Sequence, residues 1–380
     1  MKIILAPDSF KGTFSSMEVI QYLERGITKY FPNAEVVKIP IADGGEGTVD
    51  AIVAAIGGVR HEKAVTGPLG HKVRAKFAMK GDLAIIEMAE ASGLTLIQEC
   101  ERNPMDTTSY GTGELILEAL DLGAKEIIIG IGGSATNDGG IGMLQALGVT
   151  FIDVMGDPIG FGGKQLSKID HISIKNIDPR INAVKITVMC DVTNTLTGPS
   201  GATYTYGPQK GATPAQLAIL EEGMMHYEAL LMQHFGIDVS KIQGAGAAGG
   251  LGAALVVCLS GKLRPGIEAI LDLVDFDTKV MDADLVITGE GRIDGQSIYG
   301  KVPIGIGHRC MHKKTKVIVL AGSIGNDVDA VYAHGIDAIF STMDKPMSYN
   351  EVLENASVLM ASAVDRMLRM VQVGMQLKSK

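Results

Sequence analysis

The sequence predicts an α/β protein built around a Rossmann- or flavodoxin-like, doubly wound parallel sheet. Near both ends of the 380-residue chain, short apolar runs that end in Gly, Asp or Pro alternate with longer segments of helical periodicity. A chain of this length exceeds what one small hydrophobic core needs. Between about residue 65 and about residue 275 the spacing becomes irregular and suits antiparallel hairpins. We therefore expect a discontinuous domain of residues 1–65 and 276–380, and a larger mixed α/β domain of residues 66–275 inserted into it, with a cleft between them.

Eight apolar runs are predicted to be strands, and they cover residues 3–6, 36–40, 83–88, 127–131, 185–190, 285–288, 317–321 and 338–341. A helix is expected over residues 15–30, with Ser16 as its N-cap. The last helix is expected from Asn350 to about Gln376. Met360, Met367 and Met370 recur along it near helical spacing, which indicates core packing.

The most informative segment is residues 125–140, KEIIIGIGGSATNDGG. A buried strand runs into a loop of glycines and small hydroxyl residues, and a helix is expected to start near Ile141. Such a loop leaves backbone N–H groups at the helix N-terminus without partners, and these attract phosphate or carboxylate oxygens. Two alternatives stay open, because glycine-rich turns also serve tight packing and GIGGSA is a weak dinucleotide fingerprint.

The composition excludes several classes of partner. The chain has no Trp, 5% aromatic residues and a net charge of −9, so it offers neither a stacking surface nor a basic field for nucleic acid. The four cysteines are far apart in the sequence, which favours free thiols in a reducing compartment. No run resembles a signal peptide or reaches the length of a membrane span. We expect a cytoplasmic protein without membrane or nucleic-acid partners.

Charged residues follow several of the predicted strands. Asp8, Asp43, Asp191 and Glu290 all occupy such positions. The carboxyl ends of parallel strands form the ligand crevice of a doubly wound sheet. Burying these carboxylates would cost several kcal/mol unless they are paired or bind an ion. For any one of them a turn or N-cap role stays open, but the set predicts a shared polar site.

The charged residues and glycine-rich loops together suit phosphoryl transfer. This reaction needs backbone N–H groups and cations to bind the phosphates, carboxylates to bind magnesium, and a carboxylate that acts as the base. The cations Lys11, Lys210, Arg292 and Lys301 lie among glycines or turn residues, and Asp138 and Asp294 add to the acids. Two further motifs are weaker. GAGAAG at 244–249 matches a dinucleotide fingerprint but lacks a preceding strand, and GQSIYGKV at 295–302 lacks the hydroxyl residue of a P-loop.

Taken together and in order, the motifs resemble the bacterial glycerate kinase family. They are APDSFKG, ADGGEGT, TGPLG, TSYGTGELI, GIGGSATNDGG, GPQKGA, GAGAAGGLGAAL, TGEGRIDGQS and GKVPIG, and they span nearly the whole chain. The resemblance implies ATP-dependent, magnesium-assisted phosphorylation of glycerate in a cleft between two domains. Of the two products found in such a family, 2-phosphoglycerate is preferred over 3-phosphoglycerate.

The chemistry of the residues, rather than the resemblance, suggests their roles. For the general base we favour Asp191, which a strand would hold rigidly, with Asp294 as its rival. Lys11 and Arg292 are also placed in the catalytic set because they would compensate carboxylate or phosphate charge. Glycerate binding is assigned to Asp8, Ser9, Lys11, Asp43, Arg292 and Lys301. The ATP phosphates are assigned to Gly132, Gly133, Ser134, Thr136, Asn137 and Lys210, and magnesium to Asp138 and Glu290.

Two other functions remain open at this stage. A nicotinamide-dependent oxidoreductase of a small hydroxy acid would retain a reduced dinucleotide and would not consume ATP. A non-catalytic nucleotide or metabolite sensor would bind ligands without turnover. The sequence does not indicate an oligomeric state or a preferred enantiomer of glycerate. If the kinase hypothesis holds, we expect the two domains to close on the substrates about hinges near Val65 and Asp275.

Overall fold

The computed structural model describes residues 1–42 and 44–378, and the chain divides into two compact units. The terminal unit comprises the chain up to residue 43, Asp50–Gly57 and everything from Ile267 onward. The central unit comprises Gly44–Val49 and Gly58–Gly266. This division falls at residues 57 and 266, whereas the sequence placed the domain boundaries at 65 and 275. The predicted boundaries of the domains stay a prediction.

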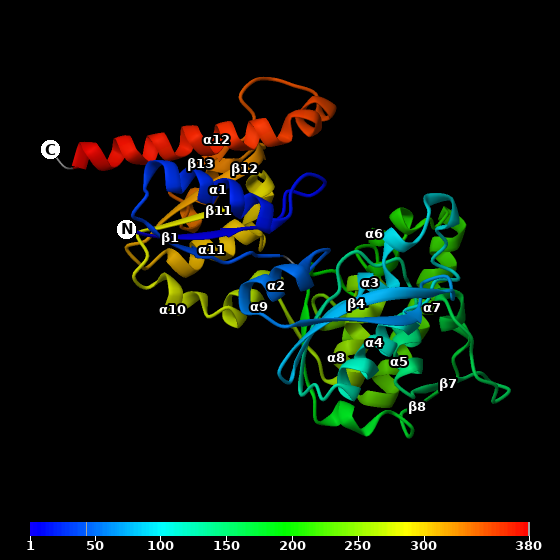
Figure 1. The fold of residues 1–380 in the computed structure, drawn as a ribbon. Coiled ribbons are helices and arrows are strands. Elements are labelled where there is room, and N and C mark those ends of the chain that lie inside the picture. The colour runs from blue at the N-terminus through cyan, green and yellow to red at the C-terminus, as the bar shows by residue number, and fades with distance from the viewer. Residues whose placement is uncertain (43, 379–380) are drawn as a thin grey trace. The chain divides into compact units, whose positions relative to one another are not determined.

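The terminal unit is built on a five-stranded parallel sheet with the strand order β13-β12-β11-β1-β2 (Figure 1). Its strands are β1 (Lys2–Pro7), β2 (Glu35–Lys38), β11 (Leu285–Ile293), β12 (Lys316–Ile324) and β13 (Ala338–Ser341). All five were predicted as apolar runs. The runs at 285–288 and 317–321 extend further than predicted, because β11 and β12 stay paired as far as Ile293 and Ile324.

The strand order reverses between β1 and β11. From β1 the chain goes on to β2 on one side, and from β11 it goes on to β12 and β13 on the other side. In a doubly wound sheet this switch point is where ligands bind, in the crevice outside the carboxyl ends of the strands. The topology therefore directs attention to the residues that end β1 and β11.

Helices cover both faces of this sheet (Figure 1). On one face α1 (Ser16–Tyr30) packs beside the long α12 (Tyr349–Lys378), and α11 (Val302–Cys310) lies against β11 and β12 on the other. The N-cap of α1 is Ser15 rather than the predicted Ser16, because Ser15 forms a capping box with Glu18. The Ser16 hydroxyl instead donates to the Pro7 carbonyl at 2.7 Å.

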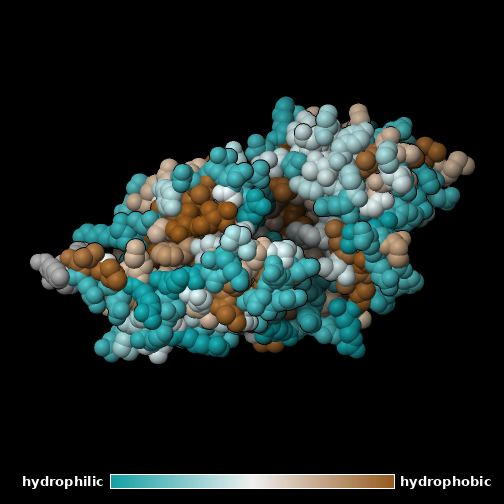
Figure 2. All heavy atoms as spheres, turned by 90° about the horizontal axis from the view of Figure 1, so that it is seen from above, coloured by the Kyte–Doolittle hydropathy of each residue, from teal (hydrophilic) through white to brown (hydrophobic). Residues whose placement is uncertain are grey.

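The methionine stripe of α12 is only partly a core stripe. Met360 and Met367 are buried in the cluster that α1, α12 and the sheet share. Met370, which the spacing also assigned to the core, is 62% exposed. Seen from the side of α12, the surface is largely hydrophilic with separate apolar patches (Figure 2). Among the described residues no helix is both long and apolar enough to span a membrane.

The remaining helices of the terminal unit are short, and they are α2 (Thr48–Ile56), α9 (Gly266–Leu273) and α10 (Phe276–Val280). α2 and α9 each begin in the central unit and continue into the terminal unit.

The central unit holds a six-stranded mixed sheet with the order β10-β9-β6-β5-β4-β3. Its strands are β3 (Val59–Thr66), β4 (Lys72–Lys80), β5 (Leu83–Glu87), β6 (Glu126–Gly130), β9 (Lys185–Met189) and β10 (Lys262–Arg264). β3, β4 and β5 form the expected antiparallel hairpins, and β5, β6, β9 and β10 run parallel. A separate antiparallel pair consists of β7 (Thr150–Ile152) and β8 (His171–Ser173).

The central unit has six further helices. They are α3 (Ala89–Ser92), α4 (Tyr110–Asp121), α5 (Ile141–Ala146), α6 (Ala202–Tyr206), α7 (Pro214–Phe235) and α8 (Leu251–Leu259). All of them except α6 contribute side chains to one large hydrophobic core. The start of α5 at Ile141 agrees with the predicted helix start. The α/β fold class is as predicted, with a doubly wound parallel sheet in one unit and a mixed sheet in the other.

Candidate active site

Two acidic residues lie side by side at the switch point of the terminal unit. Asp8 follows β1, and its backbone N–H donates to the Gly289 carbonyl at 2.8 Å, which continues the pairing of β1 with β11. Glu290 is the next residue of β11. Both side chains are buried, with 6% and 7% of their surface exposed. The parallel register therefore places two carboxylates together where a ligand would enter.

Glu290 is held in an environment that disfavours its charge. Burial, and to a smaller extent the negative charge of Asp8, raise its pKa to about 7, although the Lys301 ammonium acts in the opposite direction. The Lys301 Nζ atom is 3.5 Å from Glu290 Oε2. The other oxygen, Oε1, is buried and has no hydrogen-bond partner among the described residues. A buried oxygen without a partner is suited to receive a proton or a cation.

Arg292, Asp294 and Lys301 form a connected group beyond Glu290. Arg292 lies within β11 and not in a turn as the sequence suggested, and its Nε donates to Asp294 Oδ2 at 3.0 Å. The Lys301 ammonium also donates to the Arg292 carbonyl at 2.9 Å. Asp294 Oδ1 accepts the Gln296 N–H at 3.1 Å and so caps the 3₁₀ turn Gly295–Ile298.

The pKa of Asp294 stays below its ordinary value. Burial acts to raise it, but the nearby charges of Lys301 and Arg292 and the Gln296 N–H outweigh burial. An ionised carboxylate that already accepts two hydrogen bonds is a weak base. The role of Asp294 as a general base stays a prediction, and this geometry favours a positioning role toward Arg292.

The loop after β1 brings Ser9 and Lys11 next to Asp8. The Ser9 N–H donates to Asp8 Oδ1 at 2.6 Å, which fixes the carboxylate against its own loop. The Phe10 N–H donates to the Phe14 carbonyl at 2.8 Å and closes a tight turn that carries the exposed Lys11. The sixth residue predicted to bind glycerate, Asp43, lies outside the described residues.

The segment 295–302 does not form a P-loop. Its glycine-containing half is a 3₁₀ turn, and α11 starts only at Val302, with Lys301 as the N-cap. The side chain of Lys301 is directed back to Glu290 and to the Arg292 carbonyl. The sequence of the segment 295–302 also argued against a P-loop, and this geometry agrees.

In the central unit, the glycine-rich loop after β6 is exposed only at its beginning. Gly132 and Gly133 are exposed, whereas Ser134, Thr136 and Asn137 are buried. The Asn137 amide donates to the Thr203 hydroxyl at 3.2 Å. Of the six residues assigned to ATP phosphates, only these two glycines are exposed, and the Gly132 N–H already donates to the Gly44 carbonyl at 3.4 Å.

Asp138 already occupies the anion position at the start of α5. The carboxylate is fully buried and accepts hydrogen bonds from the N–H groups of Gly140 (3.1 Å), Gly142 (3.4 Å) and Ser109 (2.8 Å), and from the Ser109 hydroxyl (2.8 Å). Burial raises its pKa despite these donors. The expectation that the N–H groups at this helix start have no partner in the fold was wrong, because a carboxylate of the same loop satisfies them.

Lys210 holds the glycine-rich loop from its buried side and not from the solvent side. It is 1% exposed, and its ammonium donates to the Ser134 hydroxyl at 2.7 Å and to the Thr136 carbonyl at 2.6 Å. Burial lowers its pKa to about 7, although the charge of Asp138 opposes the shift. The GAGAAG segment packs on the same loop, since a Cβ atom on Gly249 would lie 2.0 Å from the Thr136 carbonyl oxygen. In this structure the motif therefore packs closely against the loop.

Asp191 follows β9 as expected and is exposed. Its Oδ1 accepts the N–H of Gly266 at 2.8 Å. The bond ties the end of β9 to the first residue of α9. Its role as general base stays a prediction.

Glu87 is a further buried carboxylate at a strand end, and it is not among the residues predicted from the sequence. This residue ends β5, is 5% exposed, and accepts the N–H groups of Gly47 (3.2 Å) and Val49 (2.5 Å). It thereby holds the ADGGEGT segment and caps the start of α2. The sequence contained the information to find Glu87, because it is a carboxylate at the end of an apolar strand, like Asp8 and Asp191.

No group of three or more metal-binding side chains is found in residues 1–42 and 44–378. Magnesium nevertheless fits the terminal unit, because it is commonly bound through one or two carboxylates and by substrate phosphates. Asp8 and Glu290 supply such a pair, and Glu290 has an oxygen that no described residue engages. Both oxygens of Asp138 already accept hydrogen bonds, which makes it the weaker of the two predicted ligands.

Comparison with known proteins identifies the family. Residues 3–372 match the model of the glycerate kinase family. The chain belongs to the glycerate kinase family. The glycerate 2-kinase of Escherichia coli K12 is 48% identical over 378 residues, which is 99% of both chains. The glycerate kinase of Bacillus subtilis 168 is 51% identical over 95% of both chains. The crystal structure of a candidate glycerate kinase 2 from Salmonella typhimurium LT2 superposes with a TM-score of 0.88, at 46% identity and 99% coverage of both chains.

Membership of the glycerate kinase family confirms three predictions from the sequence. The resemblance is correct, the α/β fold class is correct, and the chain is a kinase-family enzyme. The same membership argues against the oxidoreductase and the non-catalytic sensor.

Proposed function

We propose that this member of the glycerate kinase family transfers the γ-phosphoryl group of ATP to glycerate with the assistance of Mg²⁺. Similarity to curated glycerate kinases over nearly the whole chain, at 48–51% identity, is the observation that supports this most strongly. We prefer 2-phosphoglycerate as the product, because a relative that is 48% identical over 99% of this chain carries the name glycerate 2-kinase.

Glycerate binding is assigned to the switch point of the terminal unit. The cations Lys11, Arg292 and Lys301 would compensate the glycerate carboxylate, and Arg292 offers a planar fork for it. Asp8 and Ser9, together with Asp43, would accept or donate hydrogen bonds at the two hydroxyl groups. The capping of Arg292 by Asp294 at 3.0 Å supports this assignment, because it fixes the guanidinium in one orientation.

The reaction needs a carboxylate that takes the proton of the attacking hydroxyl. As the new O–P bond forms, the bond between the β–γ bridging oxygen and the γ-phosphorus breaks, and ADP leaves with that oxygen. Asp191 remains our candidate for the base because it is exposed at the end of a rigid strand. Lys11 and Arg292 would stabilise the charge that develops on the transferred group.

Mg²⁺, when bound, would neutralise the phosphate charges and orient the γ-phosphoryl group. In the terminal unit Glu290 and Asp8 have the donor chemistry to hold it. The exposed backbone of Gly132 and Gly133 is assigned to ATP phosphate oxygens. Lys210, Ser134, Thr136, Asn137 and Asp138 would act by holding that loop in shape.

The test is an assay of ADP release from ATP by the purified protein with Mg²⁺ and a panel of hydroxy acids. We expect release with glycerate and little with lactate, which lacks the second hydroxyl group. An absence of release with every hydroxy acid would refute the kinase proposal. Phosphorus and proton NMR of the product would then decide which hydroxyl group is phosphorylated.

We place the reaction in the cytoplasm, and the four cysteines, all within the described residues, support this because all are free thiols.

A further inference from the structure

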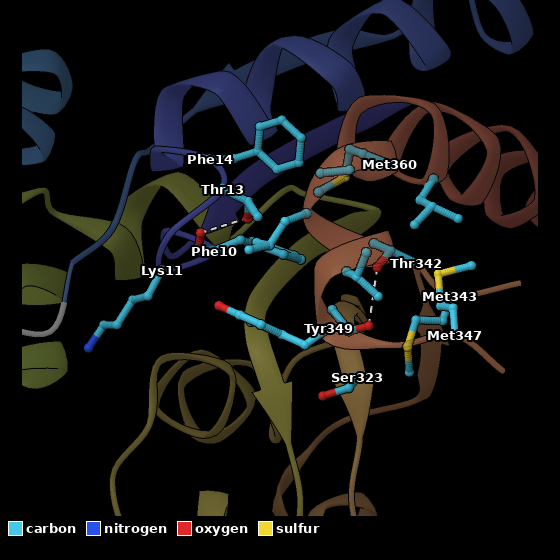
Figure 3. Close-up of a pocket in the computed structure, with 16 residues that line it drawn as sticks. Phe10, Lys11, Thr13, Phe14, Ser323, Thr342, Met343, Met347, Tyr349 and Met360 are labelled. Atoms are coloured by element: carbon cyan, nitrogen blue, oxygen red, sulfur yellow. Dashed lines mark hydrogen bonds between the residues drawn. The ribbon is translucent and has the colours of Figure 1, made fainter. Parts of the chain in front are cut away.

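The terminal unit contains an apolar pocket beside the switch point (Figure 3). Its volume is about 300 Å³. The walls come from the loop after β1, the ends of β11 and β12, the segment between β13 and α12, and the first turns of α12. The side chains that shape it are Phe10, Phe14, Met343, Met347, Tyr349 and Met360.

A few polar groups lie at defined positions around these apolar walls. Ser323 and Thr342 line the pocket, and the Thr342 hydroxyl donates to the Gly322 carbonyl at 3.1 Å. The ammonium of Lys11 extends away from the apolar side chains, at the edge of the group (Figure 3). A mainly apolar cavity with a small number of polar groups is the usual composition of a small-molecule site, and its size is at the lower end of the range of such sites.

The pocket is open to solvent on one side, since Lys11, Leu353 and Tyr349, which line it, are exposed. A ligand can therefore enter it. Glycerate does not suit it, because a small anion with two hydroxyl groups would lose its hydration against Met and Phe side chains. The other substrate of a kinase is a nucleotide, and its base is a flat, largely apolar ring system.

We propose that this pocket binds the purine base of the nucleotide substrate, with Lys11 at its edge directed to the phosphate chain. The inference rests on the proposed use of ATP and adds the place of the base. Methionine thioethers make favourable contacts with aromatic rings, and Phe and Tyr rings pack against such rings in offset or edge-to-face arrangements. Gly291 lines the pocket and directly follows Glu290 in β11, and a Cβ atom on it would lie 3.8 Å from the backbone nitrogen of Lys11.

Two substitutions on α12 provide a matched test. Ala356 lines the pocket and is half-buried, whereas Val358 lies on the same helix and is 70% exposed. Ala356→Phe would fill the space, and Val358→Phe adds a ring to the same helix outside it. Calorimetric titration would compare ADP with inorganic tripolyphosphate, which has the phosphates without the base.

We expect Ala356→Phe to weaken ADP binding at least tenfold and to leave tripolyphosphate binding within twofold of wild type. Val358→Phe should change neither. Unchanged ADP affinity in Ala356→Phe would refute the pocket assignment, and so would an equal loss of tripolyphosphate binding. If the wild-type enzyme releases ADP from ATP with glycerate while Ala356→Phe binds ADP normally, only the pocket assignment fails. If no hydroxy acid supports ADP release, the proposed function itself fails.

A second measurement does not depend on the folding of a variant. The wild-type protein would be irradiated with 8-azido-ADP, and the labelled peptides would be identified by mass spectrometry. We expect the label within residues 342–360 or 10–14, and we expect excess ADP to suppress it. Labelling confined to other segments would overturn the proposal.

Discussion

The Lys301 ammonium lies 3.5 Å from the Glu290 carboxylate at the carboxyl end of β11. The pair is asymmetric. Glu290 is nearly buried, and its pKa rises to about 7 because burial outweighs the attraction of Lys301. Lys301 is more exposed and also bonds to the Arg292 carbonyl. A carboxylate so placed gains from any further cation or proton, which is why we assign ligand binding to this position.

The stability of the ligand-free protein should depend on pH through Glu290. Its pKa is about 7 in the folded state and near 4.5 in the unfolded chain. The contribution of protonated Glu290 to the free energy of unfolding is therefore fully present below pH 4.5, and it is lost as the pH rises through 7. Glu290→Gln removes this loss, so the variant should exceed wild type by up to roughly 3 kcal/mol at pH 8 and by much less at pH 5. Urea unfolding at both pH values measures the difference, with exposed Glu354→Gln as the control. An equal difference at both pH values would contradict the role of Glu290.

Asp138→Ala should destabilise the central unit strongly. The substitution leaves three backbone N–H groups and the Ser109 hydroxyl without their buried acceptor. We expect a loss of about 3 kcal/mol or more in the free energy of unfolding. Thermal and urea unfolding would measure it against exposed Asp157→Ala. A loss no greater than that of the control would show that the carboxylate does not hold the loop.

Gly249→Ala and Gly236→Ala form a pair that separates backbone strain from steric overlap. Both glycines have a positive φ, +67° and +68°. A Cβ on Gly249 would lie 2.0 Å from the Thr136 carbonyl oxygen, whereas one on Gly236 meets no described atom within 4 Å. Gly236→Ala should cost about 1–2 kcal/mol, the usual cost of the left-handed conformation. Gly249→Ala should cost several kcal/mol more or prevent folding. Similar melting temperatures for the two variants would refute the close packing on the loop.

Arg292→Gln tests the proposed glycerate site. Loss of the guanidinium removes a charge-assisted contact to the substrate carboxylate, so the KM for glycerate should rise at least tenfold, corresponding to about 1.4 kcal/mol. The KM for ATP should change by less than threefold. Arg25→Gln, on the exposed side of α1, is the control. An unchanged KM for glycerate would remove Arg292 from the binding set.

Eight of the thirteen strands in the described residues could be placed from the sequence, because a strand inside a parallel sheet is a short apolar run. The five strands of the terminal sheet and three of the central sheet were found this way. β3 and β4 were expected only as hairpins, because they are exposed along much of their length and carry charged residues. Met370 was misplaced for a related reason, since helical spacing gives the direction of a side chain but not where the helix ceases to be covered.

Residue order and local periodicity are enough to indicate the family, the α/β class and the segments that carry glycines and charges next to strands. How those residues are used depends on the three-dimensional fold. Lys210 is buried beneath Ser134 although 76 residues separate them, and Asp138 turns inward to cap α5. Strand order likewise brings Asp8 next to Glu290 from opposite ends of the chain. Burial and long-range pairing set the hydrogen bonds and pKa values of these groups, and no local pattern contains that information.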